Sequence, residues 1–139
     1  MRTLRIAATV VVIAAALAGC SGRPVASLKP GECFDFDRDG TEVSTVEVVE
    51  CSMPHVAEVF AVFDVKLDAY DSDAIATTAD EQCLAAFEPY AGIPYAAAKY
   101  YFRTMAPSES SWGKGARSVV CFVYPTEGTL DRSIKKADA

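Results

Sequence analysis

The order of apolar and polar positions separates a short N-terminal apolar run from a longer region of mixed pattern. Residues 6–18 are apolar except for Thr9, and Arg2 and Arg5 precede them. This run is well short of the roughly 20 apolar residues that cross a bilayer as a helix. A basic start, a short apolar stretch and small residues at its end are typical of a secretory signal, which we assign to residues 1–19.

The region after this run has the pattern of a strand-rich fold. Residues 57–65 are apolar at both odd and even positions, as in a central strand that is covered on both faces. The other strand-like segments are short and are separated by turn residues. Besides 57–65, we expect strands over residues 33–36, 43–51, 99–105 and 118–124, with 130–134 as a candidate edge strand.

The apolar period changes to three and four residues after position 72, which predicts one amphipathic helix. Ser72 or Asp73 can cap its start, and Gly92 with Pro94 ends it. A single helix can bury its apolar stripe only against the sheet. We therefore predict an α+β fold in which one amphipathic helix packs on a mainly antiparallel sheet of about five strands. The stripe consists of Ile75, Ala79, Cys83, Ala86, Phe87 and Tyr90.

The remaining segments fit one domain with a linker at each end. Residues 20–30 contain a glycine and two prolines without apolar periodicity, which indicates a flexible tether. Residues 31–134 form the predicted domain. Residues 135–139, together with the segment just before them, are expected to be a frayed tail.

Leu17-Ala18-Gly19-Cys20, at the end of the apolar run, resembles the lipobox of bacterial lipoproteins. The resemblance implies a diacylglycerol on the Cys20 thiol, cleavage before Cys20 and a location at the outer face of the cytoplasmic membrane. Two or more acyl chains anchor a protein stably where one does not. The expected membrane contact is therefore this acyl anchor.

The net charge restricts the partners. The chain has 13 Lys and Arg against 19 Asp and Glu, and removal of Arg2 and Arg5 with the signal leaves 11 against 19, a net charge of −8. Such acidity argues against nucleic acid and against electrostatic adhesion to anionic lipid heads. No cofactor is expected.

Four cysteines follow Cys20, and an even count in a small exported domain predicts two disulfides. A zinc site is the competing interpretation, but the sequence has no C-x-x-C pair. Four cysteines allow three connectivities. Cys83 lies in the middle of the helical stripe and Cys121 in the middle of an apolar strand, so we predict Cys83–Cys121, which leaves Cys33–Cys51.

Asp35, Asp37 and Asp39 with Gly40 match the opening of a calcium loop, because alternate carboxylates in a tight turn can converge on one cation. The bidentate glutamate of such a loop is missing, since its position is taken by Val46. A solvated turn is the favoured interpretation. A calcium-stabilised structural spacer is the alternative.

His55 is the only histidine, and Glu58 is near enough in sequence to pair with it. Such a pair is the candidate acid–base couple of an envelope hydrolase. Catalysis by one histidine also requires a nucleophile in contact and a group that orients the ring, and neither a G-x-S-x-G nor a metalloprotease motif is present. A structural role of His55 at the start of the central strand is favoured.

Trp112 is the only tryptophan and lies in the Gly- and Ser-rich segment 107–115. A lone tryptophan in a loop is either a recognition residue or a plug over the edge of the core. The plug is favoured, and Trp112 remains a candidate binding residue together with His55 and Glu58.

Several strings resemble the septum formation domain of actinobacterial envelope proteins. They are Gly31-x-Cys33-Phe34-Asp35, Cys51-Ser52-x-Pro54-His55-x-x-Glu58, and Trp112-x-x-Gly115-x-Arg117-x-Val119-x-Cys121. The resemblance covers about residues 31–134 and implies an extracytoplasmic domain of envelope proteins, with no established catalytic residues to carry over. We therefore expect a lipid-anchored, non-enzymatic binding module that recognises a protein or a cell-wall component of the septum or envelope machinery.

Overall fold

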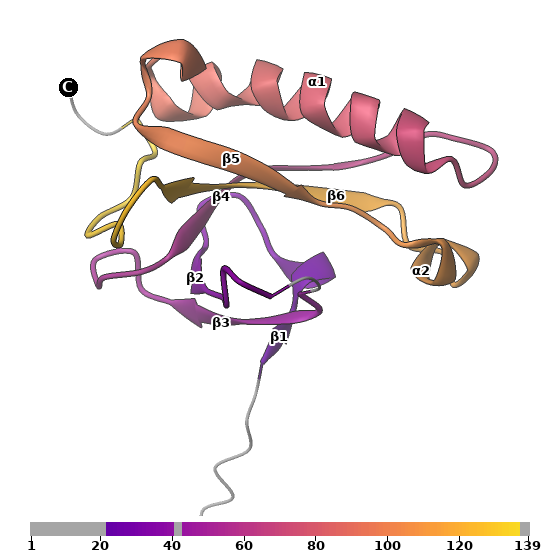
Figure 1. Ribbon diagram of the computed structural model, residues 1–139, viewed down its shortest axis with the longest axis horizontal. Helices are drawn as coiled ribbons and strands as arrows, with labels where there is room; N and C mark the ends of the chain where they lie inside the picture. Colours follow the sequence, from indigo (N-terminus) through magenta and orange to yellow (C-terminus); the bar gives the residue numbers. More distant parts are fainter. Residues whose placement is uncertain (1–21, 41–42, 137–139) are drawn as a thin grey trace, which may run out of the picture.

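A six-stranded antiparallel sheet and one long helix make up the described part of the chain, residues 22–40 and 43–136 of the computed structural model (Figure 1). This is the predicted α+β class. The sheet has one strand more than expected, β1, which is only two residues long and leaves no pattern in the sequence. The strands, in the sheet order β1-β3-β2-β4-β6-β5, are β1 (Arg23–Pro24), β3 (Thr45–Val49), β2 (Cys33–Asp35), β4 (Ala57–Asp64), β6 (Ser118–Pro125) and β5 (Tyr100–Met105).

The sheet is covered on both faces, and β4 and β6 lie at its centre. Helix α1 (Ser72–Ala91) packs on one face, while β1, β2 and β3 curl over the other (Figure 1). Along β6, Val119, Cys121 and Val123 face α1, and Val120 and Phe122 belong to a second core on the opposite face. The prediction of a central strand with two buried faces is confirmed for β4, although a bulge between Val59 and Ala61 shifts its alternation.

Helix α1 buries its apolar stripe against the sheet, as predicted. Its first turn is capped by Asp71, whose side chain accepts hydrogen bonds from the backbone N–H groups of Asp73 and Ala74. The prediction of Ser72 or Asp73 as the cap was therefore wrong by one residue, since Asp71 offers the same short acceptor. Gly92 ends the helix with a φ of 77°, a left-handed conformation that favours glycine.

Two disulfides fasten the elements. Cys83–Cys121 joins the buried side of α1 to β6, and Cys33–Cys51 joins β2 to the turn after β3. These are the two pairings that the sequence predicted. Cys33, Cys83 and Cys121 have no exposed surface, whereas Cys51 is partly exposed.

Residues 22–30, the described part of the segment expected to be a tether over 20–30, are folded, which corrects that expectation for them. Arg23 pairs with Val46 as part of β1, and its guanidinium forms an ion pair with Glu32 at 2.7 Å. The 3-10 helix η1 (Val25–Ser27) follows, and Val25 and Leu28 are buried in the second core. The predicted signal over residues 1–19 and the predicted lipid-attachment residue Cys20 lie outside the described residues.

The C-terminal segment also differs from expectation. Residues 130–134 form no strand, and only Leu130 makes a β-bridge, to His55. Ile134, expected in the frayed tail, is buried, and the Lys136 N–H donates to the carbonyl of Tyr90 at 2.8 Å. The burial of Ile134 and individual hydrogen bonds, rather than a sheet ladder, therefore hold this segment. Residues 137–139 lie outside the described part.

The predicted loop 107–115 contains a short helix, α2 (Glu109–Gly113), which Ser108 caps. Across the two described ranges, no helix combines the length and apolar character that a membrane crossing requires.

Candidate functional site

Glu58, one of the two candidate acid–base residues, is fully buried on β4 and holds other parts of the chain together. Its carboxylate accepts three hydrogen bonds: from the Tyr90 hydroxyl at 2.5 Å, the Ser133 hydroxyl at 2.7 Å and the Ile134 N–H at 2.8 Å. Buried carboxylates are tolerated when such donors replace water. Glu58 thus connects β4 to α1 and to the C-terminal segment.

The Tyr90 hydroxyl reports on this environment. Burial is the largest cause that raises the pKa of the Tyr90 phenol well above its ordinary value. The hydrogen bond to Glu58 and the negative charge of Glu58 raise it further, whereas the hydrogen bond with Ser133 lowers it. The neutral phenol is therefore the form that fits this site. Its role is to donate a hydrogen bond.

His55 is also fully buried, at the start of β4. Its Nδ1 lies 2.7 Å from the carbonyl of Met53, and a carbonyl can only accept, so Nδ1 carries a proton. Its Nε2 has no hydrogen-bond partner among the described residues. Its backbone pairs with Leu130 through hydrogen bonds of 2.9 and 2.8 Å.

The predicted His55–Glu58 pair is brought close but is not hydrogen-bonded. Potential ligand atoms of Cys33, His55 and Glu58 lie within 4.8 Å of one another. The Cys33 sulfur is bonded to Cys51 and cannot act as a thiolate ligand. The remaining two donors have no exposed surface through which a substrate could reach them. The geometry suits a structural centre.

Two of the three aspartates of the calcium alternative, Asp35 and Asp37, have separate structural roles. Asp35 accepts a hydrogen bond from the Val56 N–H at 2.7 Å, which ties β2 to the start of β4. Asp37 accepts from the Asp39 N–H at 3.0 Å and closes the turn. Among the described residues, the only cluster of three potential ligands is the one around His55. The structure therefore does not gather Asp35, Asp37 and Asp39 into a site.

Trp112 is a plug rather than an exposed recognition residue. It is 7% exposed and contacts Tyr70 with the two ring centroids 6.0 Å apart. The Arg117 guanidinium lies 3.6 Å from the centroid of the Trp112 ring and donates to the carbonyls of Trp112 and Ala116. The structure thus places Trp112 in the core beneath α2 and not on an exposed recognition surface.

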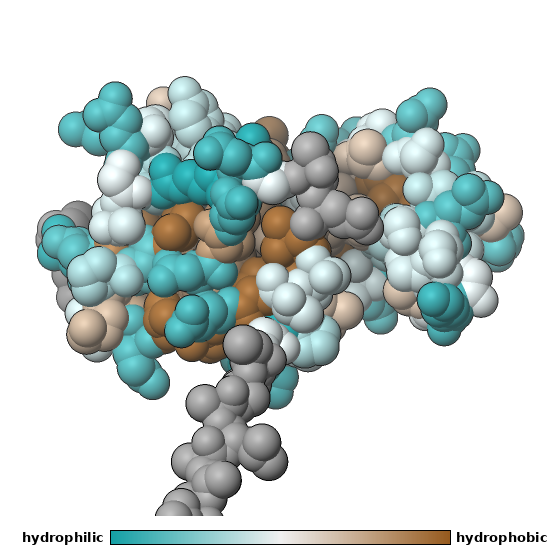
Figure 2. Space-filling model, turned by 60° about the horizontal axis from the view of Figure 1, so that its bottom comes forward, coloured by the Kyte–Doolittle hydropathy of each residue, from teal (hydrophilic) through white to brown (hydrophobic). Residues whose placement is uncertain are grey.

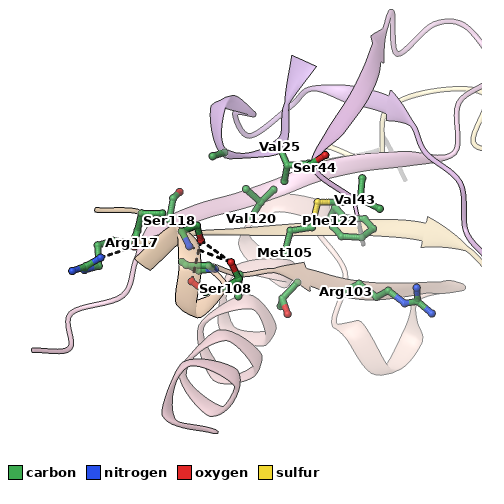
Figure 3. Close-up of a pocket in the computed structure, with 16 residues that line it drawn as sticks. Val25, Val43, Ser44, Arg103, Met105, Ser108, Arg117, Ser118, Val120 and Phe122 are labelled. Atoms are coloured by element: carbon green, nitrogen blue, oxygen red, sulfur yellow. Dashed lines mark hydrogen bonds between the residues drawn. The ribbon is translucent and has the colours of Figure 1, made fainter. Parts of the chain in front are cut away.

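An open groove lies on the face of the sheet opposite α1, and no feature of the sequence pointed to it. Its volume is about 490 Å³. Val25, Val43 and Ser44 face Met105, Val120 and Phe122 across it (Figure 3). On this side of the molecule, hydrophobic surface is visible between hydrophilic margins (Figure 2). The other lining residues are Ala26, Arg103, Thr104, Ala106, Pro107, Ser108, Ser111, Ala116, Arg117 and Ser118.

The groove is basic at its ends in a chain that is acidic overall. Arg103 and Arg117 lie at opposite ends, and the lining residues include no Asp or Glu (Figure 3). The Arg117 guanidinium is held by Trp112, as described above. Arg103 is exposed and lies over the Tyr124 ring at 5.3 Å from its centroid. Within the described residues, neither arginine forms an ion pair.

One wall of the groove is a sheet edge. β5 is the last strand in the order, with β6 as its one partner in the described sheet. The N–H of Phe102 donates to the Tyr95 hydroxyl in the 3-10 helix η2 (Tyr95–Ala97) at 3.4 Å, so it faces away from β6. Backbone groups of residues two apart on a strand point the same way. The N–H and carbonyl of Thr104 therefore face the open edge beside the groove.

These features define a class: an α+β domain held by two disulfides, with an open, partly apolar groove and with the two acid–base candidates, His55 and Glu58, buried. The chain belongs to the septum formation family, whose model matches residues 30–138. The resemblance seen in the sequence is thereby confirmed.

Two curated relatives, from Mycobacterium tuberculosis and Mycobacterium bovis, both carry the name "Putative lipoprotein LppN". Each is 29% identical to this chain over 110 residues, covering 75% of this chain and 59% of the relative. The match thus spans little more than half of the length of these relatives. No solved structure gives a significant match.

Proposed function

We propose that this protein is a lipid-anchored, non-enzymatic binding module of the bacterial cell envelope, and that it binds a protein or wall component in the groove. The open groove between η1 and β5 is the observation that carries the proposal, because exposed apolar surface bordered by polar residues is typical of interaction sites. The lipobox-like string before Cys20 and the lipoprotein name of the relatives support an anchor at the outer face of the cytoplasmic membrane.

The burial of the acid–base candidates supports the non-enzymatic part of the proposal. His55 and Glu58 have no exposed surface, and the Glu58 oxygens are occupied by Tyr90, Ser133 and Ile134. An envelope hydrolase would require both side chains to reach a substrate. His55→Gln is expected to lower stability and to leave partner binding intact.

A crosslinking experiment in intact cells tests the binding site. A photo-crosslinking residue replaces Ser44, an exposed residue of the groove lining, in the full-length chain, and the control carries it in place of Glu81, which is exposed on α1. We expect an adduct of defined mass from position 44 and none from position 81. Equal adducts from both positions, or none from 44, would contradict the groove as the binding site.

The anchor is tested separately. Cys20→Ser is expected to move the protein from the membrane fraction to the soluble fraction, since the serine hydroxyl cannot form the thioether to diacylglycerol. Ser21→Ala is the control and is expected to stay in the membrane fraction. A membrane-bound Cys20→Ser protein would refute the acyl anchor.

A further inference from the structure

We infer that the groove receives an extended acidic peptide segment of a partner protein, which adds as a strand to the free edge of β5 beside Thr104. The inference rests on the proposed function and names the chemistry of its partner. Strand addition to an exposed sheet edge is a general mode of peptide recognition, in which backbone hydrogen bonds supply affinity and side-chain pockets supply specificity.

The backbone contribution comes from the part of β5 that nothing else covers among the described residues. Tyr95 occupies the edge at Phe102, whereas the outward N–H and carbonyl of Thr104 have no such cover. Thr104, Met105 and Ala106 also line the groove. A segment that pairs with Thr104 is thus placed directly along the groove.

The side-chain contribution follows from the alternation along β5. Phe102 packs toward α1, so Arg103 and Met105 project from the opposite face, where Met105 joins the second core. Residues opposite each other on adjacent strands have Cβ atoms about 5 Å apart. Because Arg103 and Met105 are two residues apart, the partner segment needs an acidic and an apolar residue two apart on the same face.

Charge selects the acidic segment over a neutral or basic one. The groove has arginines at both ends and no acidic lining residue, in a chain whose net charge is −6. Arg103 is exposed and has no ion-pair partner in the described residues. Complementary charge across an interface favours the matching partner and rejects the opposite one.

The test uses the full-length lipidated protein in detergent and a labelled synthetic peptide, Thr-Glu-Thr-Val-Thr-Val-Thr, with binding measured by fluorescence anisotropy. Two comparison peptides carry Lys in place of Glu, or N-methyl groups on alternate backbone nitrogens. The N-methyl groups remove the donors that a strand pairing needs. We expect measurable binding of the Glu peptide and at least about fivefold weaker binding of both comparison peptides.

Two protein variants locate the peptide. Arg103→Glu is expected to weaken the Glu peptide about fivefold and to strengthen the Lys peptide, whereas Arg132→Glu, the same charge change on a side chain 83% exposed elsewhere, changes neither. Thr104→Pro removes an outward N–H without touching the β6 ladder, and proline is tolerated on edge strands. It is expected to weaken the Glu peptide about fivefold, with Thr104→Val as its control.

Several results would overturn the inference: no binding of the Glu peptide, equal binding of the Lys or N-methylated peptide, or equal effects of Arg103→Glu and Arg132→Glu. Occupation of the groove by a second copy, by the acyl chains or by the chain's own residues would appear as failure of the peptide to bind. If Thr104→Pro does not fold, the inference is tested by Arg103→Glu and by the N-methylated peptide instead. A crosslink from position 44 combined with peptide failure would leave the proposed function standing and refute the acidic strand.

Discussion

The Glu58 carboxylate accepts a hydrogen bond from the Tyr90 hydroxyl at 2.5 Å, which joins a central strand to the last turn of α1. The same carboxylate fastens Ser133 and Ile134. One buried side chain thus connects three segments that are far apart in the sequence. Removing one member of such a network leaves the other buried groups without partners, which costs more than the bond itself contributes.

Glu58→Gln is expected to lower the free energy of unfolding by about 2–3 kcal/mol, because three hydrogen bonds lose their charged acceptor and the amide brings an unmatched donor. Urea denaturation at neutral pH measures the loss. Glu88→Gln, on the exposed side of α1, is the matched control and is expected to change stability by less than about 0.5 kcal/mol. Equal losses in both variants would contradict the structural role of Glu58.

Stability is expected to fall at alkaline pH because of Tyr90. Its pKa in the folded protein is raised above the ordinary value of about 10, so its contribution is fully present below pH 10 and is lost as the pH rises above it. Tyr90→Phe is expected to be less stable than the parent at pH 8 and to lose less stability between pH 9 and 11. Tyr101→Phe, at an exposed position, serves as the control. A parallel decline in all three proteins would refute the assignment.

The two disulfides are expected to contribute unequally. Cys83–Cys121 spans 38 residues and Cys33–Cys51 spans 18. Chain entropy alone predicts losses of about 4 and 3 kcal/mol when each pair is replaced by alanines. Replacing the buried Cys83 and Cys121 by alanine would also leave a cavity between α1 and β6, which adds to the loss for this pair. Denaturant unfolding of the two double variants checks the order, and the reverse order would show that the α1–β6 bridge is not the main constraint.

Arg117→Ala is expected to loosen α2 and to expose Trp112, because the guanidinium stacks on that ring and donates to two carbonyls. The loss in stability should be about 1–2 kcal/mol. As the only tryptophan, Trp112 reports directly through acrylamide quenching of its fluorescence. Arg103→Ala is the control and should leave quenching unchanged. Unchanged quenching in Arg117→Ala would refute the role of this stacking.

The sequence predicted those parts of the fold that follow from a strong period. The stripe of α1 placed Cys83 against the sheet, and the apolar alternation of β6 placed Cys121 beneath it. The helix start was missed by one residue because Asp71, Ser72 and Asp73 all have side chains that can cap a first turn. β1 was missed because two residues have no period to detect.

The groove could not be predicted, because it depends on how the sheet curls. Val25 and Met105 are 80 positions apart in the sequence, and they face each other only because β1 and β3 fold back over β6. Arg103 between Phe102 and Thr104 was a weak signal, since a charge on the outer face of a strand is usually only solvated. His55 and Glu58 attracted attention by residue type, yet burial gives them a structural role.

If the protein is anchored as we propose, the early start of its folded body sets its height above the bilayer. With Cys20 acylated as we propose, Arg23 in the first strand follows after three residues, a reach of about 10 Å, whereas a free linker to position 30 would have allowed about 35 Å. The body is then held almost against the lipid headgroups. A partner that binds in the groove, as we propose, must then present its segment within this thin juxtamembrane layer, rather than deep in the wall.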